Sequence, residues 1–174
     1  TRLILETPTL EGMRTLEHVT LIDPLIKTYL LDRKVTTSYP NKELCSNGKC
    51  YNTLLLSVTG EDNSELPAQK YDTAILVNTL EHCENAVRVL DNIYHALKPG
   101  GVLVFGEAFA TEWQLRSNDR CHPLQPTQQL FRDYLAKFTG EPLIEPQTGD
   151  QIRGVSKSPA MARTLFAIVT KGSN

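Results

Sequence analysis

Carboxylate and amide side chains follow several short apolar runs of this 174-residue chain. An acid directly after a buried strand can accept hydrogen bonds from both hydroxyls of a ribose, which is one way to hold a nucleoside-bearing cofactor. Asp23, which follows the run His18 to Ile22, is the leading candidate for this chemistry. The other candidates at the ends of apolar runs are Glu6, Glu61, Asp62, Asn78 and Glu107.

Each of these residues also has a purely structural interpretation. Asp23 precedes Pro24 and could simply form a turn. Asn78 could cap the end of a strand, or its amide could bond the amino and carboxylate groups of a ligand. Glu61 and Asp62 could face the ribose or adenine of a cofactor, or could belong to a solvated acidic loop. The sequence leaves these alternatives open.

Three side chains are candidates for a general base, namely His82, Glu107 and His122. Such a base is needed only if the reacting group of a substrate must lose a proton, and its geometry must be right before its pKa matters. His82 is expected at the start of a helix, where a packing role is the alternative. Glu107 begins the polar segment 107–126, which also contains His122 and could form a lid over a cleft.

The elements that must position these groups follow from the apolar pattern. Strands are predicted over Arg2–Glu6, His18–Ile22, Thr53–Val58, Thr73–Val77, Val102–Phe105 and Thr164–Thr170. Asn85 is expected to cap a helix that Pro99-Gly100-Gly101 ends, and Thr127 to cap a second helix. The apolar stripe of the first helix is predicted to be Ala86, Val87, Leu90, Ile93, Tyr94 and Leu97. That of the second is predicted to be Leu130, Phe131, Tyr134, Leu135 and Phe138.

Strands that alternate with helices and are apolar on both faces predict an α/β fold with a mostly parallel, doubly wound sheet. We expect a single domain over residues 1–174. Because ligands of such sheets bind at the carboxyl ends of the strands, the polar residues at those ends are expected to form the site.

Two blocks of sequence resemble the central part of the class I S-adenosylmethionine-dependent methyltransferases, of the type 11-like kind. They are YDTAILVNTLEH at residues 71–82 and LKPGGVLV at residues 97–104. Ile22-Asp23-Pro24 is similar to the family's second strand with its ribose-binding acid, and residues 60–67 are similar to the loop that lines the adenine. The resemblance covers residues 19–111, with weaker agreement up to Val169.

The resemblance implies a Rossmann-like sheet, seven-stranded if complete, with an antiparallel last strand. It implies methyl transfer from S-adenosylmethionine to a small-molecule acceptor. The cofactor would be bound by Glu6, Asp23, Glu61, Asp62, Asn78 and Thr79. Among these, Asp23 would hold the ribose, Glu61 or Asp62 the adenosine edge, and Asn78 the region near the methionine end.

The sequence departs from the family at its first motif. The strand over Leu3 to Glu6 runs into Thr7-Pro8-Thr9-Leu10-Glu11-Gly12, which lacks the glycine-rich turn that lets backbone approach the cofactor. The turn could be a variant built on Pro8 and Gly12, the start of the chain could be lost, or the domain could bind no cofactor. A non-catalytic, methyltransferase-like scaffold is therefore the alternative function. A nicotinamide-dependent oxidoreductase is disfavoured because the sequence has no G-x-G-x-x-G.

Composition and cysteine spacing limit the binding partners and metal sites that we expect. A formal net charge of −2 gives no basic surface for nucleic acid or an acidic membrane, and no apolar run is long enough to span a bilayer. Cys45 and Cys50 flank Asn47-Gly48, a strong hairpin signal. The four cysteines do not form a zinc-binding pattern, so we expect no metal site and, as a mild default, a reducing cytoplasmic setting.

Overall fold

A computed structural model of the chain describes residues 18–26, 43–46, 49–109, 122–139 and 164–172. They belong to two compact units, Thr1–Thr59 and Gly60–Asn174, each of which is described by itself. The predicted strand that ends at Glu6 lies outside the described residues.

The first unit contains a mixed three-stranded sheet with the order β1-β3-β2. Strand β1 (His18–Ile22) runs parallel to β3 (Lys49–Leu56), with Ile22 opposite Leu56. Strand β2 (Glu43–Ser46) pairs with β3 in the antiparallel sense and places Cys45 opposite Cys50. The hairpin signal at Asn47-Gly48 is thereby confirmed, and β3 begins earlier than the apolar run alone predicts.

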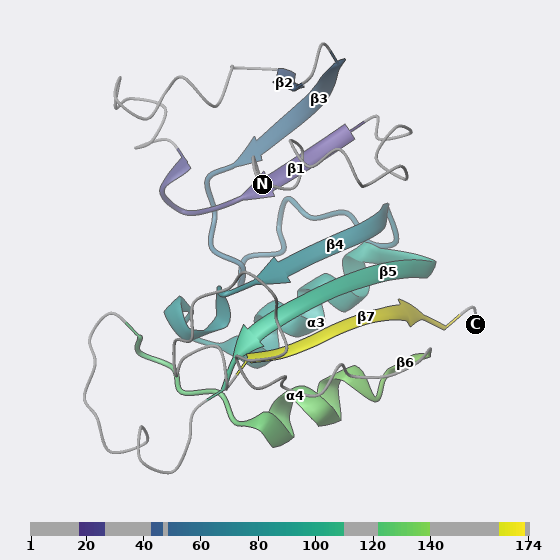
Figure 1. The fold of residues 1–174 in the computed structure, drawn as a ribbon. Coiled ribbons are helices and arrows are strands. Elements are labelled where there is room, and N and C mark those ends of the chain that lie inside the picture. The colour runs from purple at the N-terminus through teal and green to yellow at the C-terminus, as the bar shows by residue number, and fades with distance from the viewer. Residues whose placement is uncertain (1–17, 27–42, 47–48, 110–121, 140–163, 173–174) are drawn as a thin grey trace. The chain divides into compact units, whose positions relative to one another are not determined.

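The second unit contains a four-stranded sheet with the order β4-β5-β7-β6 (Figure 1). Strands β4 (Tyr71–Val77) and β5 (Leu97–Ala108) are parallel. Strand β7 (Thr164–Lys171) is antiparallel to β5 and to the short β6 (Phe138–Thr139). The expected parallel pairing and antiparallel last strand are confirmed.

Two helices pack beside this sheet, and both predicted caps are present. In α3 (Ala86–Ala96), the side chain of Asn85 accepts a hydrogen bond from the N–H of Arg88 at 3.0 Å. In α4 (Gln128–Leu135), Thr127 Oγ1 accepts from the N–H of Leu130 at 3.2 Å. These side chains satisfy amides that have no partner within the helix.

The core of the second unit joins one face of the sheet to both helices. Its largest fully buried side chains include Phe105, Phe131, Leu90, Leu103 and Leu165. Tyr134 of α4 donates its hydroxyl proton to the carbonyl of Leu90 of α3 at 2.8 Å, so the two helices are also tied directly.

The predicted stripe of α3 is wrong at Val87, and its last predicted member, Leu97, is buried but is the first residue of β5. Val87 is 51% exposed, whereas Val89, which the prediction omitted, is only 3% exposed. Gly60 explains the difference, because a Cβ atom there would lie 3.1 Å from Cγ1 of Val89. The chain ahead of β4 therefore packs against the Val89 side of the helix and rotates the buried face away from Val87.

Helix α3 ends at Ala96 and β5 begins at the next residue, Leu97, close to the backbone of β4. Gly100 has a φ of 77°, in the left-handed region that glycine adopts freely. At Gly101, a Cβ atom would lie 2.9 Å from the carbonyl oxygen of Lys98 and 3.1 Å from that of Tyr71. The two glycines thus lie within β5, at the irregularity in its pairing with β4, and allow the two backbones to approach closely.

Candidate active site at the carboxyl ends of the strands

The carboxylate of Glu107, near the end of β5, holds the turn that follows β4. The N–H of Thr79 donates to both of its oxygens at 3.0 Å, and the N–H of Leu80 donates to Oε2 at 3.1 Å. Asn78 adopts a φ of 51°, and its N–H donates to the carbonyl of Gly106 at 2.9 Å. The carboxyl ends of β4 and β5 are therefore fastened together, with Asn78 and Thr79 exposed on the turn.

Glu107 is buried, with only 1% of its surface exposed. Burial raises the pKa of its carboxyl group from 4.5 to about 7, although the hydrogen bonds from the amides of Thr79 and Leu80 oppose that rise. Both oxygens already accept backbone hydrogen bonds. This geometry describes a group that shapes the turn, and its assignment as a general base stays a prediction.

Glu61 is attached to the chain just before α3. Its Oε1 accepts hydrogen bonds from the N–H groups of Glu84 at 2.8 Å and Asn85 at 3.1 Å. The buried amide of Asn92 donates to the carbonyls of Gly60 and Glu61, each at 3.0 Å. The loop carrying the predicted adenosine-binding acids is consequently fixed to α3 from two directions.

Asp62, the second acid of this loop, makes a local turn. Its Oδ1 accepts a hydrogen bond from the N–H of Ser64 at 2.9 Å, and this bond lowers the pKa of the Asp62 carboxyl group. Asp62 is half-buried and ionised at neutral pH, as an acceptor for ligand hydroxyl or amino groups should be.

Asp23 follows β1 in the first unit. Its contacts are compatible both with a turn-forming role and with a role in binding a ligand. Its N–H donates to the carbonyl of Leu56 at 3.2 Å, which places it directly at the end of the parallel pair β1 and β3. Its Oδ1 accepts from the N–H of Leu25 at 2.7 Å, which is the expected turn. The same carboxylate has a second oxygen with which to accept a hydrogen bond.

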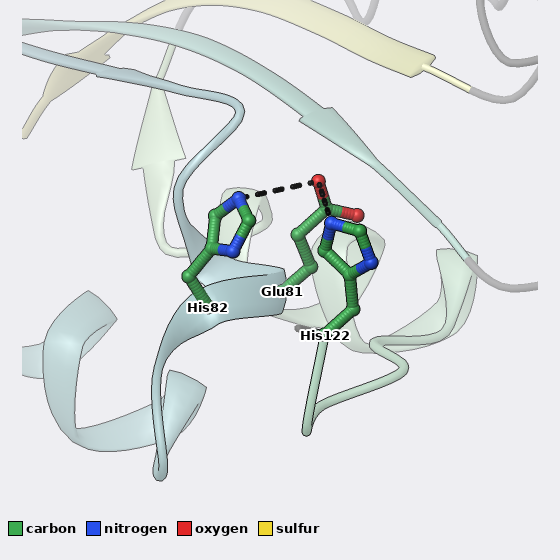
Figure 2. Close-up of side chains that lie close together, drawn as sticks. All are labelled: Glu81, His82 and His122. Carbon is green, nitrogen blue, oxygen red and sulfur yellow. Dashed lines mark ion pairs between the residues drawn. The ribbon is translucent and has the colours of Figure 1, made fainter. Parts of the chain in front are cut away.

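Three more side chains meet at the 3₁₀ turn Leu80–His82 (η3). Glu81 Oε1 lies 3.7 Å from Nε2 of His82 and 3.7 Å from Nε2 of His122. Figure 2 shows the carboxylate between the two imidazoles. The ring centroids of His82 and His122 are 4.8 Å apart. The structure thus brings both histidines that sequence analysis selected into one cluster around Glu81.

Cys83 lies next to this turn and supports packing. It contacts the core, and its thiol lies 3.5 Å from the carbonyl oxygen of Thr79. Burial, with smaller contributions from Glu61 and Glu107, raises the pKa of Cys83 to about 11, so it is a neutral thiol at physiological pH. Cys83 therefore fills space between η3 and the start of α3.

Comparison with known proteins agrees with this architecture. Residues 41–103 match a family model described as a methyltransferase domain. Together with the solved structures described below, this match shows that the chain has the fold of the class I methyltransferases. No curated protein matches it by sequence. Within the described residues, no helix has both the length and the apolar character needed to cross a membrane.

Solved structures show the same fold at low sequence identity. The CMeT domain of the citrinin polyketide synthase is 17% identical, with a TM-score of 0.58; the match covers 100% of this chain and 43% of that one. The N-methyltransferase NodS from Bradyrhizobium japonicum is 18% identical, with a TM-score of 0.56, and covers 89% and 74% of the two chains. A methyltransferase from Methanosarcina mazei is 16% identical, with a TM-score of 0.56, and covers 95% and 87%. This chain therefore spans less than half the length of the CMeT chain that it matches.

Sequence analysis located most of the polar groups of this region but not their connections. Glu81 was seen only as part of the Leu-Glu-His triplet, and Asn92 was not selected at all. Glu81 and His122 are far apart in sequence, so no local spacing signals their meeting. Glu6 and the segment 110–121 of the predicted lid lie outside the described residues.

Proposed function

We propose that this methyltransferase domain transfers a methyl group from S-adenosylmethionine to a small-molecule acceptor. The observation that carries the proposal is the turn after β4, where a buried carboxylate fixes the exposed Asn78 and Thr79 at the carboxyl ends of two parallel strands. Ligands of open α/β sheets bind at this edge. NodS, a relative in fold, has been solved in complex with S-adenosyl-L-homocysteine.

The chain offers hydrogen-bonding groups suited to each polar part of the cofactor. Asp23 is proposed to accept a ribose hydroxyl through Oδ2, because Oδ1 accepts the N–H of Leu25. Of the two loop acids we favour Asp62 for the adenosine edge, since Oε1 of Glu61 is directed to the amides before α3. Asn78 and Thr79 are proposed to face the methionine end.

The reaction places few demands on the protein's own acids and bases. The cofactor supplies an electrophilic methyl group on a sulfonium, and the protein must hold the acceptor in line with it and exclude water. The rigid turn serves this purpose because it fixes Asn78 and Thr79 before any ligand binds. Glu107 contributes by positioning that turn.

Calorimetric titration of the full chain tests the proposal. We expect S-adenosylmethionine and S-adenosylhomocysteine each to bind once per chain and to raise the melting temperature. Adenosine and NAD⁺ serve as matched ligands that lack the methionine part, and they should bind far more weakly. Absence of heat and of a thermal shift with both cofactor forms at millimolar concentration would remove the enzymatic assignment.

One observation favours a second candidate, a methyltransferase-like domain that acts only as a scaffold. The family match begins at residue 41, and residues 7–12 lack the glycine-rich turn on which close approach of the cofactor depends. This candidate predicts a folded chain that binds neither cofactor form. The same titration therefore separates the two functions.

A further inference from the structure

We propose that Glu81, His82 and His122 form a binding site for one divalent transition-metal ion of the Zn²⁺ type. One ligand atom from each of the three residues lies within 4.8 Å of the others. The set consists of two imidazoles and one carboxylate, and Figure 2 shows the side chains converging from two separate segments. The inference concerns a metal site that methyl transfer does not require.

The distances are those of a site that needs only small side-chain movements to close. Two ligands about 2.1 Å from one ion, at a tetrahedral angle, lie roughly 3.4 Å apart. Glu81 Oε1 is 3.7 Å from Nε2 of each histidine. Rotations of these partly exposed side chains can supply the remaining few tenths of an ångström, and they can also bring the two imidazole rings closer together.

The backbone beneath the cluster is already held in place. The N–H of Leu124 donates to the carbonyl of Glu81 at 3.3 Å, which ties the segment bearing His122 to η3. The N–H of His82 donates to the carbonyl of Thr79 at 3.1 Å. Binding would therefore order three side chains, and it would not have to bring two distant segments together.

The donor set selects the class of ion. Ca²⁺ and Mg²⁺ prefer sites made of oxygen ligands, whereas imidazole nitrogen favours Zn²⁺, Co²⁺, Ni²⁺ and their neighbours. Three protein ligands leave at least one coordination position for water or another small oxygen or nitrogen donor. Side-chain exposures of 24% for Glu81, 49% for His82 and 39% for His122 leave the site accessible to an ion from solvent.

Two imidazoles can also lie close to one carboxylate when no metal is bound, so the experiment must detect the ion itself. The full chain, produced without a histidine tag and stripped with a chelator, is titrated with Co²⁺ followed by visible absorption and with Zn²⁺ followed by calorimetry. No methyl donor is present, so the result is independent of cofactor binding. We expect one ion per chain, a cobalt spectrum without a sulfur-to-metal charge-transfer band, and a rise in melting temperature of about 5 °C at saturating Zn²⁺.

Three single variants locate the site. Glu81→Gln, His82→Gln and His122→Gln should each weaken binding at least about tenfold, since even groups that only support metal ligands have effects of about that size. His95→Gln is the matched control, because His95 is an exposed histidine on α3 outside the cluster, with Nδ1 2.8 Å from the carbonyl of Asp91. It should bind like the parent chain. Circular dichroism without metal verifies that each variant folds.

Three results would overturn the site. They are no binding of either ion at about 100 μM, binding that the three variants leave unchanged, and a cobalt spectrum dominated by thiolate ligation.

Discussion

Replacement of Glu107 by Gln should make the stability of the chain less dependent on pH. Glu107 is 1% exposed, and burial raises the pKa of its carboxyl group from 4.5 to about 7. Between these two values the folded state binds a proton that the unfolded state has released. Stability from this group is fully present below pH 4.5 and is lost as the pH rises through about 7.

The magnitude follows from the size of the shift. A rise from 4.5 to about 7, at ~1.4 kcal/mol for each pKa unit, corresponds to a loss of stability on the order of 3 kcal/mol across that interval. Glutamine has nearly the same shape and does not titrate. The free energy of unfolding of the wild type minus that of Glu107→Gln should therefore fall by about this amount between pH 4.5 and pH 8.

The assay is urea unfolding of both proteins at several pH values, since groups common to both cancel in the difference. Glu65→Gln controls for the loss of one negative charge, because Glu65 lies exposed in the loop before β4. A difference that stays constant with pH would refute the reasoning, as would one that grows in favour of the wild type as pH rises. The first result would mean that the backbone amides of Thr79 and Leu80 fully offset the effect of burial on the pKa of Glu107, and the second that they outweigh it.

Three further predictions concern binding and packing. Asp23→Ala should weaken S-adenosylhomocysteine binding by ~1–3 kcal/mol in calorimetric titration. Asp23→Asn keeps an oxygen that can accept the turn hydrogen bond, so this variant separates the loss of charge from the loss of the turn. An unchanged dissociation constant in both variants would reject the ribose role. Val89→Asp should unfold the domain in thermal melts, whereas Val87→Asp should change stability by only about 0.5 kcal/mol, because Val89 is buried and Val87 exposed. Asn92→Ala should cost about 1–3 kcal/mol in urea unfolding, since two loop carbonyls lose their donor; equal stability would show that water replaces the side chain.

The elements of the fold were largely predictable because their signals are local. The apolar runs after residues 70 and 101 and the cap at Asn85 are signals carried by neighbouring residues. The end of α3 was expected at Pro99-Gly100-Gly101, whereas the helix ends at Ala96 and these three residues lie in β5. The antiparallel β7 was expected only from the resemblance. Val87 was misassigned because helical periodicity gives the width of an apolar stripe, while its rotation depends on what packs against it, here the chain at Gly60.

The candidate site was predictable in composition but not in arrangement. Polar residues at strand ends can be recognised from sequence, and Asp23, Asp62 and Asn78 were selected in this way. The Glu107 carboxylate accepts hydrogen bonds from two backbone amides that lie 27 and 28 residues away in the sequence. These bonds depend on the register of β4 against β5, which no local sequence pattern encodes. The same holds for the cluster around Glu81.

Amide hydrogen exchange, compared with and without S-adenosylhomocysteine, tests the central claim most directly because it reports on every proposed contact in one experiment. The account predicts slower exchange in the bound state at residues 57–64 and 78–82 and around Asp23, with α4 unchanged. Ligand binding that left all three of those segments unprotected, or that protected only α4, would contradict it.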